Sequence, residues 1–281
     1  MSELMTQKID SLPPLPKTIM EIEDFRGKVG EKEPFELLKI IEKDALIIST
    51  LLKVSNSAMF GFRSKVETPS RAINLLGVNF TISIAIGGTV QNLLQANLDP
   101  YGISTDDFMD ASNLASSLVN LWVSKIDYDL KEELLLPAFL QETGKFILSE
   151  LIHESDKVDE FQDAIINSGK ELSEIEHEFV GFSCSKITAN IFKHWKLSHN
   201  LIFAIGFVGD IKNCPDEFKE KAQILEVIKI LSDITAPLSE TNISKALSKA
   251  QEYELDTSLL SKAITRIKDK IEEEEGIIVT S

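Results

Sequence analysis

The side chains best suited to hold a metal or move a proton at neutral pH are the four histidines, and their spacing favours neither task. They are His153, His177, His194 and His199. None forms an HxH, HxxxH or HExxH pattern, and none is followed directly by Asp. His194 precedes Trp195 near the end of an expected helix, where a charged imidazole interacts favourably with the helix dipole. The pattern therefore predicts histidines at helix ends or on the surface rather than a metal centre.

Nucleophilic catalysis has no better support, because the sequence contains neither a GxSxG turn nor a Gly-rich phosphate loop with its lysine. The two cysteines, Cys184 and Cys214, show no CxxC spacing, which predicts reduced thiols and a cytoplasmic chain. Cys184 is expected to be a small buried hydrophobe. Adjacent acids such as Asp106-Asp107 do not face each other on a helix, so they predict solvated helix faces rather than an acid-base pair.

The balance of charge narrows the possible partners. The 281 residues include 29 Lys and Arg against 45 Asp and Glu, a formal net charge of −16. Such a chain repels nucleic acid and anionic membrane surfaces, so neither is an expected partner. Hydrophobic residues make up 43% of the chain, enough for a core, but no apolar run approaches the roughly 20 residues that span a bilayer. With no apolar region of a signal peptide at the N-terminus, the sequence predicts a soluble chain.

Apolar residues recur every three or four positions from Thr18 onward, which is typical of amphipathic helices, and no alternating strand pattern is present. The expected fold class is therefore all-α. Helices are predicted over 34–43, 45–54, 69–76, 78–95, 104–125, 131–153, 156–168, 171–180, 184–195, 198–209, 216–235, 242–252 and 257–274.

Several of these boundaries follow from capping residues. Thr68 and Pro69 begin a helix that Gly77 ends, and Ser104 with Asp107 resembles a capping box. Inside the apolar segment 78–95, Gly87-Gly88 weakens a helix by about 1 kcal/mol per Gly relative to Ala. We therefore expect a neighbouring helix to approach the backbone closely there.

Turn-forming residues between Leu98 and Gly102 mark the best candidate seam in a chain that has no Gly/Ser-rich linker. We expect a single unit over residues 1–281. Within it, an N-terminal helical lobe covers about 8–98 and a second helical lobe, with the C-terminal helices, covers about 103–275.

Four segments occur in a fixed order in the first third of the chain. They are LPPLP at 12–16, IIEKDA at 40–45, LKVSNSAMFG at 52–61 and RAINLLG at 71–77. In combination they resemble the HDOD family, the HD-related output domain of bacterial signalling proteins. The resemblance runs from about Leu12 to Gly209 and more faintly beyond, and it implies a multi-helix fold whose second lobe is HD-like.

The first segment has a physical interpretation beside the resemblance. Pro13, Pro14 and Pro16 make a stiff chain with few hydrogen-bond donors, which can pack Leu12 and Leu15 against the first helix pair.

The other motif residues are also expected to be structural. Asn56 and Ser57 can cap a helix or turn, and Phe60 can fill the core. Arg71 is expected to form an ion pair across the two lobes, with an acid ligand or stacking on a ring as alternatives. The remaining motif residues of this kind are Gly61 at a sharp exit, Gly77 and Trp195.

The second half is similar to the HD phosphohydrolases and their cyclic-dinucleotide phosphodiesterase relatives, whose His and His-Asp groups bind metals that activate water. Where the resemblance places those ligands, this chain has Ala111 before Ser112, Gln141-Glu142, Cys184, and Val208 with Gly209, while Asp233 matches a last family Asp. Each replacement removes a ligand. The resemblance therefore implies a vestigial pocket around these residues, with no catalytic residue, no metal and no cofactor.

Three functions follow as hypotheses. The favoured one is a non-catalytic regulatory module that binds other signalling proteins. The second is a sensor that binds a nucleotide or cyclic dinucleotide in the vestigial pocket without turnover. The third is a degenerate phosphohydrolase that uses Glu142 and Asp233. Neither the identity of the partner nor the oligomeric state follows from the sequence.

Overall fold

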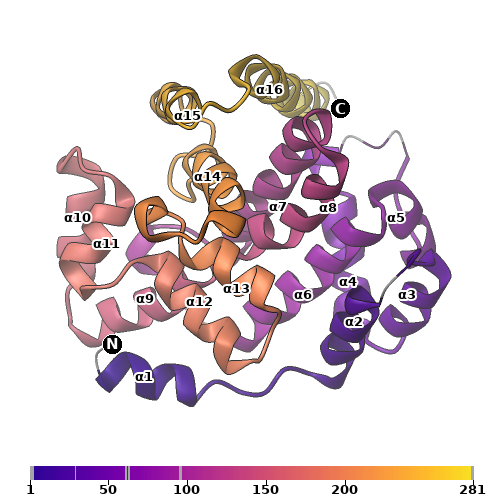
Figure 1. Cartoon of the computed structure of the whole chain (residues 1–281), viewed down its shortest axis with the longest axis horizontal. Coiled ribbons are helices and arrows are strands. Elements are labelled where there is room, and N and C mark those ends of the chain that lie inside the picture. Colours follow the sequence, from indigo (N-terminus) through magenta and orange to yellow (C-terminus); the bar gives the residue numbers. More distant parts are fainter. Residues whose placement is uncertain (1–2, 29, 61, 63, 95–96, 280–281) are drawn as a thin grey trace.

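The computed structural model describes residues 3–28, 30–60, 62, 64–94 and 97–279, and the side chains among them except at 58 and 274–279. This part of the chain is helical and contains no strand, which confirms the all-α prediction (Figure 1). The α-helices are α1 (Glu3–Asp10), α2 (Lys17–Gly27), α3 (Pro34–Ile41), α4 (Ala45–Ser55), α5 (Pro69–Leu76), α6 (Val78–Leu94), α7 (Thr105–Trp122), α8 (Tyr128–Leu140), α9 (Gly144–Glu154), α10 (Val158–Asn167), α11 (Leu172–Val180), α12 (Cys184–His194), α13 (His199–Gly206), α14 (Asp216–Leu231), α15 (Glu240–Glu252) and α16 (Thr257–Val279). The 3-10 turns are η1 (Ala58–Phe60), η2 (Asp99–Tyr101), η3 (Val123–Lys125) and η4 (Ile211–Asn213).

One predicted helix is wrong. The segment 131–153 is two helices, α8 and α9, separated by a turn at Gln141–Thr143. The reason is the close approach of α12: the Gly144 N–H donates to Thr188 Oγ1 at 2.8 Å, and a Cβ on Gly144 would lie 2.5 Å from the Cys184 carbonyl oxygen. Glycine at the start of α9 permits this contact, and the turn before it carries Glu142.

The N-terminal helix α1, which is not among the predicted helices, lies against α9 and α12. Lys8 forms ion pairs with Glu150 at 3.0 Å and Glu154 at 2.7 Å. The proline-rich segment then runs along the bottom of the molecule to α2 (Figure 1). Trp195 Nε1 donates to the Pro13 carbonyl at 2.9 Å, so this segment is anchored by the residue that directly follows α12.

Leu12 and Leu15 are partly buried against the core, as expected for the stiff segment. Pro13 and Pro14 are exposed, and Pro16 directly precedes α2 with extended backbone angles.

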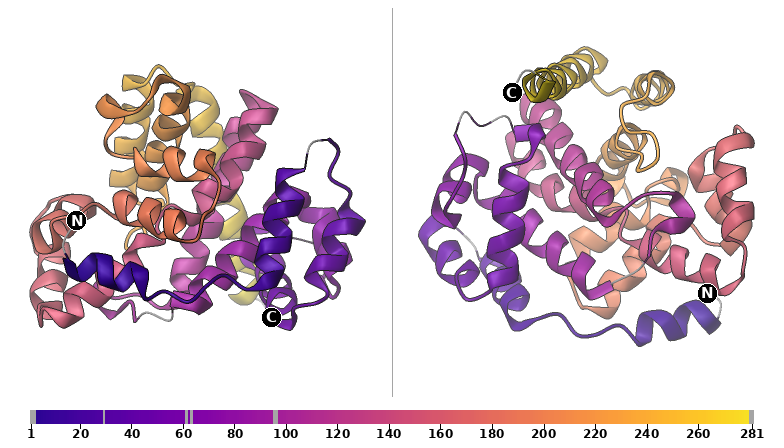
Figure 2. Two further views of the ribbon diagram at one scale, coloured as in Figure 1. Left: turned by 60° about the horizontal axis from the view of Figure 1, so that its bottom comes forward. Right: turned by 180° about the vertical axis from the view of Figure 1, so that it is seen from behind.

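Helix α6 contacts α4 and α8 (Figure 2). A Cβ on Gly87 would collide with the ring of Phe139, and one on Gly88 would lie 2.5 Å from Thr50 Cγ2. The predicted close approach at these two glycines is confirmed. Helices α2 to α5 lie together on one side of α6 (Figure 1). The division into two lobes near residue 100 stays a prediction.

The predicted caps are present. Thr68 Oγ1 accepts from the Arg71 N–H at 3.3 Å, and Gly77, with φ of 84°, follows the last residue of α5. Ser104 and Asp107 form a reciprocal capping box at the start of α7. Local sequence rules therefore set these helix ends correctly.

Asn56 closes α4 through its side chain. Its Nδ2 donates to the carbonyls of Leu52 at 2.7 Å and Val66 at 2.8 Å, and its Oδ1 accepts from the Val66 N–H at 2.8 Å. The hydroxyl of Ser57, by contrast, has no hydrogen-bond partner among the described residues, so its expected capping role is absent there.

The prediction for Phe60 agrees with the structure, and the prediction for Arg71 does not. Phe60 packs against the core, with its ring edge-to-face on Phe80 at 5.4 Å. The predicted ion pair of Arg71 across the lobes is wrong for the described residues: its exposed guanidinium donates instead to the hydroxyl of Ser64, seven residues earlier in the chain. Gly61 lies outside the described residues.

No helix in the described part of the chain combines the length and the apolar composition that crossing a bilayer requires.

Candidate functional site

Glu142 lies in the turn between α8 and α9 and contacts two lysines. Its Oε2 is 2.8 Å from Lys145 Nζ, one helical turn along, and its Oε1 is 2.9 Å from Lys229 Nζ on α14. Its side chain is 9% exposed, so both contacts lie almost out of water. A carboxylate in such a place needs compensation, and here two ammonium groups supply it.

The network continues inward from Lys145. Its Nζ lies 2.5 Å from Glu176 Oε1 on α11, and the same oxygen accepts from the Tyr101 hydroxyl at 3.1 Å. Glu176 is fully buried and its Oε2 has no hydrogen-bond partner in the described structure. We refer to Tyr101, Glu142, Lys145, Glu176 and Lys229 as the ion-pair cluster. Two carboxylates and two ammonium groups make its formal charge zero.

The pKa values follow from these contacts. Burial alone would raise the pKa of Glu142, but the positive charges of Lys145 and Lys229 outweigh burial and lower it to about 2. Burial would lower the pKa of both lysines, and the facing carboxylates reverse this, so the pKa of each lies above its ordinary value. Glu142, Lys145 and Lys229 are therefore charged over the whole physiological pH range.

Cys184, the first residue of α12, lies beside this cluster. Its Sγ is 3.7 Å from Glu142 Oε2, and its residue is 1% exposed. Burial, with a further contribution from the negative charge of Glu142, raises the pKa of the thiol to about 12. The thiol is protonated and unreactive at neutral pH, as the sequence predicts for a buried small hydrophobe.

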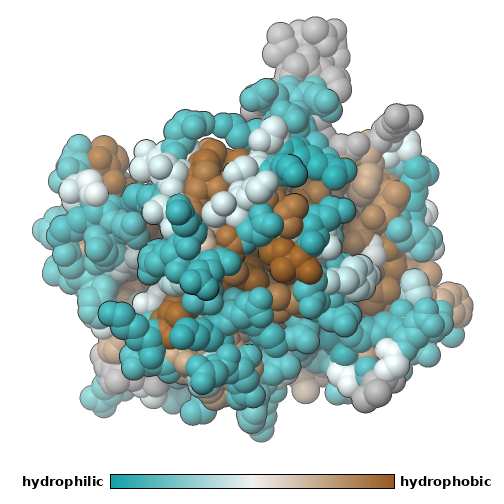
Figure 3. All heavy atoms as spheres, turned by 45° about the horizontal axis from the view of Figure 1, so that its top comes forward, coloured by the Kyte–Doolittle hydropathy of each residue, from teal (hydrophilic) through white to brown (hydrophobic). Residues whose placement is uncertain are grey.

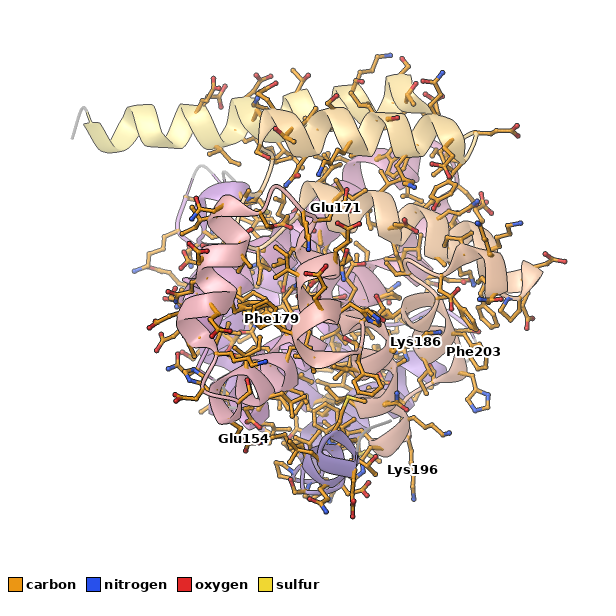
Figure 4. All side chains as sticks on the ribbon, turned by 90° about the vertical axis from the view of Figure 1, so that its left-hand side faces the viewer. Glu154, Glu171, Phe179, Lys186, Lys196 and Phe203 are labelled. Carbon is orange, nitrogen blue, oxygen red and sulfur yellow. The ribbon has the colours of Figure 1, made fainter. Side chains whose placement is uncertain are left out.

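A cavity of about 1050 Å³ opens beside the cluster. Its walls come from α11, the first turn of α12, α14 and α15, and Glu142 with Lys145 and Lys229 lies on its floor. Figure 4 views the molecule from this side and shows Glu171 at the end of α11 that faces α15. Lys245 of α15 reaches Glu171 at 3.3 Å, so an ion pair joins two walls of the cavity.

The structure brings together five of the eight residues predicted to form the vestigial pocket. Those lining the cavity are Glu142, Cys184, Val208, Gly209 and Asp233.

Two of these five have structural contacts of their own. The Gly209 N–H donates to Glu226 Oε2 at 3.2 Å. Asp233 Oδ1 accepts from Thr235 and Ala236 within its own turn, so this carboxylate closes the turn after α14 and does not contact Glu142.

The other three predicted residues do not line the cavity. Ala111 and Ser112 are buried on α7, and the Ser112 hydroxyl donates to the Phe108 carbonyl of its own helix at 3.0 Å. Gln141 is 1% exposed, and both polar ends of its side chain lack a partner among the described residues. Its backbone carbonyl accepts from Thr188 Oγ1 at 3.2 Å. The pocket prediction is therefore incorrect for these three positions, because α7 and the Gln141 side chain belong to the core behind the cavity.

Sequence reasoning assigned no role to Lys145, Glu176 or Lys229. A signal was present for Lys229, which interrupts the apolar run Val227–Leu231, and for Lys145, which lies three residues after Glu142. A lysine within an apolar helix face is rarely buried unless it is paired. The identity of its partner has no sequence signal, because Glu142 and Lys229 are distant in the chain.

The histidines lie away from the cluster's contacts. His153, His177 and His199 are exposed, and His177 is at the cavity wall. His194 is half-buried with Nδ1 3.8 Å from Asp10 Oδ1, at the end of α12 as expected.

The residues present do not fit the metal centre of an HD phosphohydrolase. Within the described residues no three His, Cys, Asp or Glu side chains are grouped as ion ligands. Of the two carboxylates at matched positions, Asp233 is bonded within its own turn, and Glu142 already has an ammonium group on each oxygen. A divalent cation there would meet two positive charges at close range, which is unfavourable in a buried site.

Comparison with known proteins gives distant relatives. An uncharacterized protein from Treponema pallidum (strain Nichols) is 21% identical over 225 residues, which is 76% of this chain and 41% of that protein. The chain therefore spans less than half the length of this curated relative.

Two solved structures share the fold. A virulence factor from Campylobacter jejuni subsp. jejuni is 25% identical, with a TM-score of 0.56, and the match covers 96% of this chain and 100% of that one. A candidate phosphohydrolase from Shewanella amazonensis SB2B is 19% identical, with a TM-score of 0.69 and 96% of both chains covered. The family model described as the HDOD domain matches residues 12–211, and the chain therefore belongs to the HDOD family.

Proposed function

We propose that this protein is a non-catalytic signalling module that acts by binding other proteins. The observation that carries the proposal is the state of Glu142. In the HD arrangement that the chain resembles, the matched acid faces metal ions, whereas here Lys145 and Lys229 hold both of its oxygens at 2.8 and 2.9 Å. These two ammonium groups supply positive charge that a hydrolytic site would take from metal ions.

A metal and activity measurement tests the non-catalytic part. Protein purified without chelators is assayed for bound manganese, iron and zinc, and for hydrolysis of bis-p-nitrophenyl phosphate and of cyclic dinucleotides with added Mn²⁺. We expect substoichiometric metal and no turnover above the rate without protein. Stoichiometric manganese or iron together with turnover that is lost in Glu142→Gln would overturn the proposal.

A second candidate, a small-molecule sensor, is favoured by the cavity of about 1050 Å³. A thermal-shift screen against nucleotides and cyclic dinucleotides tests it. A ligand present at 100 times its dissociation constant adds about 2.7 kcal/mol of stability, which raises the melting temperature measurably. A panel without any shift removes this candidate and leaves protein binding as the function to pursue.

A further inference from the structure

The walls of the cavity carry an excess of negative charge. Among the residues that line it, carboxylates outnumber lysines by eight to five, and arginine is absent from the described lining. The surplus has the same sign as the net charge of −16 on the whole chain. An acidic concave surface on an acidic protein raises the local concentration of cations and speeds the approach of basic partners.

The lysines of the cavity are already engaged. Lys145 and Lys229 contact Glu142 on the floor, and the three at the mouth also have carboxylate partners. These mouth pairs are Lys170 with Glu178 at 2.6 Å, Lys245 with Glu171 at 3.3 Å, and Lys249 with Glu252 at 3.0 Å. An anionic ligand would have to displace a carboxylate from each lysine that it used, so the cavity is poorly suited to phosphates.

Two carboxylates of the lining remain outside any ion pair among the described residues. Glu174 Oε2 accepts only from the Glu171 N–H, at 3.2 Å, as part of the cap of α11. Asp233 engages Oδ1 alone, in its own turn. Each therefore keeps an oxygen that can accept from an incoming ammonium or guanidinium group.

A further polar group available to an occupant is Ser185, the second residue of α12. It is 3% exposed and lines the cavity, and its hydroxyl forms no hydrogen bond with another described residue. A hydroxyl that borders the cavity in this way can donate to, or accept from, a polar atom of an occupant.

The chemistry of the walls favours a polypeptide over a nucleotide. The volume of about 1050 Å³ lies at the upper end of the roughly 300–1,000 Å³ range of small-molecule pockets, so size alone does not separate the two occupants. The described lining has no Phe, Tyr or Trp on which a base could stack, but it has serine hydroxyls such as Ser244 and Ser248 of α15 that suit a peptide backbone. Figure 3 shows this top side of the molecule, where hydrophilic side chains surround patches of hydrophobic ones.

We infer that the cavity between α11 and α15 is the docking site for a basic segment of a partner protein, which inserts lysine or arginine side chains toward Glu174 and Asp233. This inference rests on the proposed function and names where the partner binds and by what chemistry. Electrostatic docking of this kind weakens with salt, because the mouth of the cavity is open to solvent.

The experiment measures fluorescence anisotropy of a labelled ten-residue peptide in which Arg alternates with Ala, added to the full chain. The comparison peptide carries Glu in place of Arg. We expect the Arg peptide to bind at about 50 mM salt and to weaken at about 300 mM, and the Glu peptide not to bind.

Two double variants locate the binding. Glu174→Gln with Asp233→Asn keeps the acceptor oxygens of both caps while removing both charges, and it should weaken the Arg peptide about fivefold or more. Its matched control, Glu31→Gln with Asp129→Asn, removes two exposed charges outside the cavity and should change binding less than about twofold. Ser185→Ala should also weaken binding without lowering the melting temperature.

Equal losses in the two double variants, binding of the Glu peptide, or no binding of the Arg peptide would each overturn the inference. None of these outcomes contradicts the proposed function as long as the protein shows no hydrolase activity. Turnover with bound metal, in contrast, would overturn the proposed function whatever the peptide does.

Discussion

Two regions of the molecule contain segments by which the chain resembles its family, and they are held in different ways. In residues 52–77, Asn56 and Thr68 bond to backbone atoms no more than ten residues away. In the ion-pair cluster, Lys145 reaches Glu176 and Glu142 reaches Lys229, which lie on other helices. The first region is stabilised by neighbours in sequence and the second by neighbours in space.

The two regions also differ in how they respond to loss of a group. Asn56 lies at the surface, where water replaces lost hydrogen bonds. Lys145 is 2% exposed and its partners Glu142 and Glu176 are 7% and 0% exposed, so removal of one charge leaves another buried and unpaired. The cluster should therefore be much the more sensitive region.

The strongest test of this contrast is Lys145→Met. It leaves Glu176 buried without a cation and Glu142 with Lys229 alone, and we expect it to lower the free energy of unfolding by about 3–5 kcal/mol in urea titrations at pH 7. Lys53→Met, which removes the lysine of an exposed pair with Asp106 (66% and 70% exposed side chains), should cost less than about 1 kcal/mol. Similar losses in the two variants would show that burial of the cluster has no energetic weight.

Acid pH gives the next largest effect. The folded pKa of Glu142, about 2, lies below its ordinary value of 4.5, so its contribution is present above about pH 5 and is lost as pH falls toward 2. This amounts to about 3 kcal/mol at 1.36 kcal/mol per pKa unit. The drop in unfolding free energy between pH 5 and pH 2.5 should be smaller in Glu142→Gln than in the unchanged protein. Parallel pH profiles for the two proteins would refute the assigned pKa.

Asn56→Ala tests the region held by sequence neighbours. The variant loses three hydrogen bonds between Asn56 and the backbone of Leu52 and Val66, and we expect a loss of about 2 kcal/mol. Asn56→Asp keeps the acceptor for the Val66 N–H but loses the donor, so its free energy of unfolding should lie between those of Asn56→Ala and the unchanged protein. A loss as large as that of Lys145→Met would erase the distinction between the regions.

The smallest effect is expected for Thr68→Ala, which removes the side-chain cap of α5. Loss of such a cap costs about 1 kcal/mol, and Thr68→Ser should recover most of it because serine offers the same oxygen. Chemical denaturation of the three proteins measures the difference. An alanine variant as stable as the unchanged protein would mean that Pro69 alone is enough to start the helix.

The same contrast explains what could be predicted from the sequence. The caps Thr68 and Ser104 bond to backbone atoms within the next helical turn, so their roles were predictable. The role of the two glycines of α6 was predictable because glycine is unusual inside an apolar helix. Five of the residues matched to metal ligands line one cavity, while their role as a vestigial pocket stays a prediction.

What escaped prediction depends on packing between distant helices. The turn at Gln141–Thr143 exists because α12 lies against Gly144, and no local signal outweighs the apolar periodicity that runs through it. The pairing of Lys229 with Glu142 likewise requires knowing that α14 passes the start of α9. The prediction for Arg71 failed for the opposite reason. A distant ion-pair partner was expected for its charge, but its guanidinium bonds to Ser64, which is close in sequence.

The close packing at Gly87 and Gly88, which have no side chains, limits how α6 can move. With Phe139 against one glycine and Thr50 against the other, α6 has no room to separate from its neighbours without both contacts opening together. Its buried amides should therefore exchange hydrogen with solvent only when the whole molecule unfolds, and should be the last to exchange in D₂O. The amides in the exposed first turn of α5 should exchange far sooner. Slowly exchanging amides along α6 would therefore mark the part of the protein that cannot open locally.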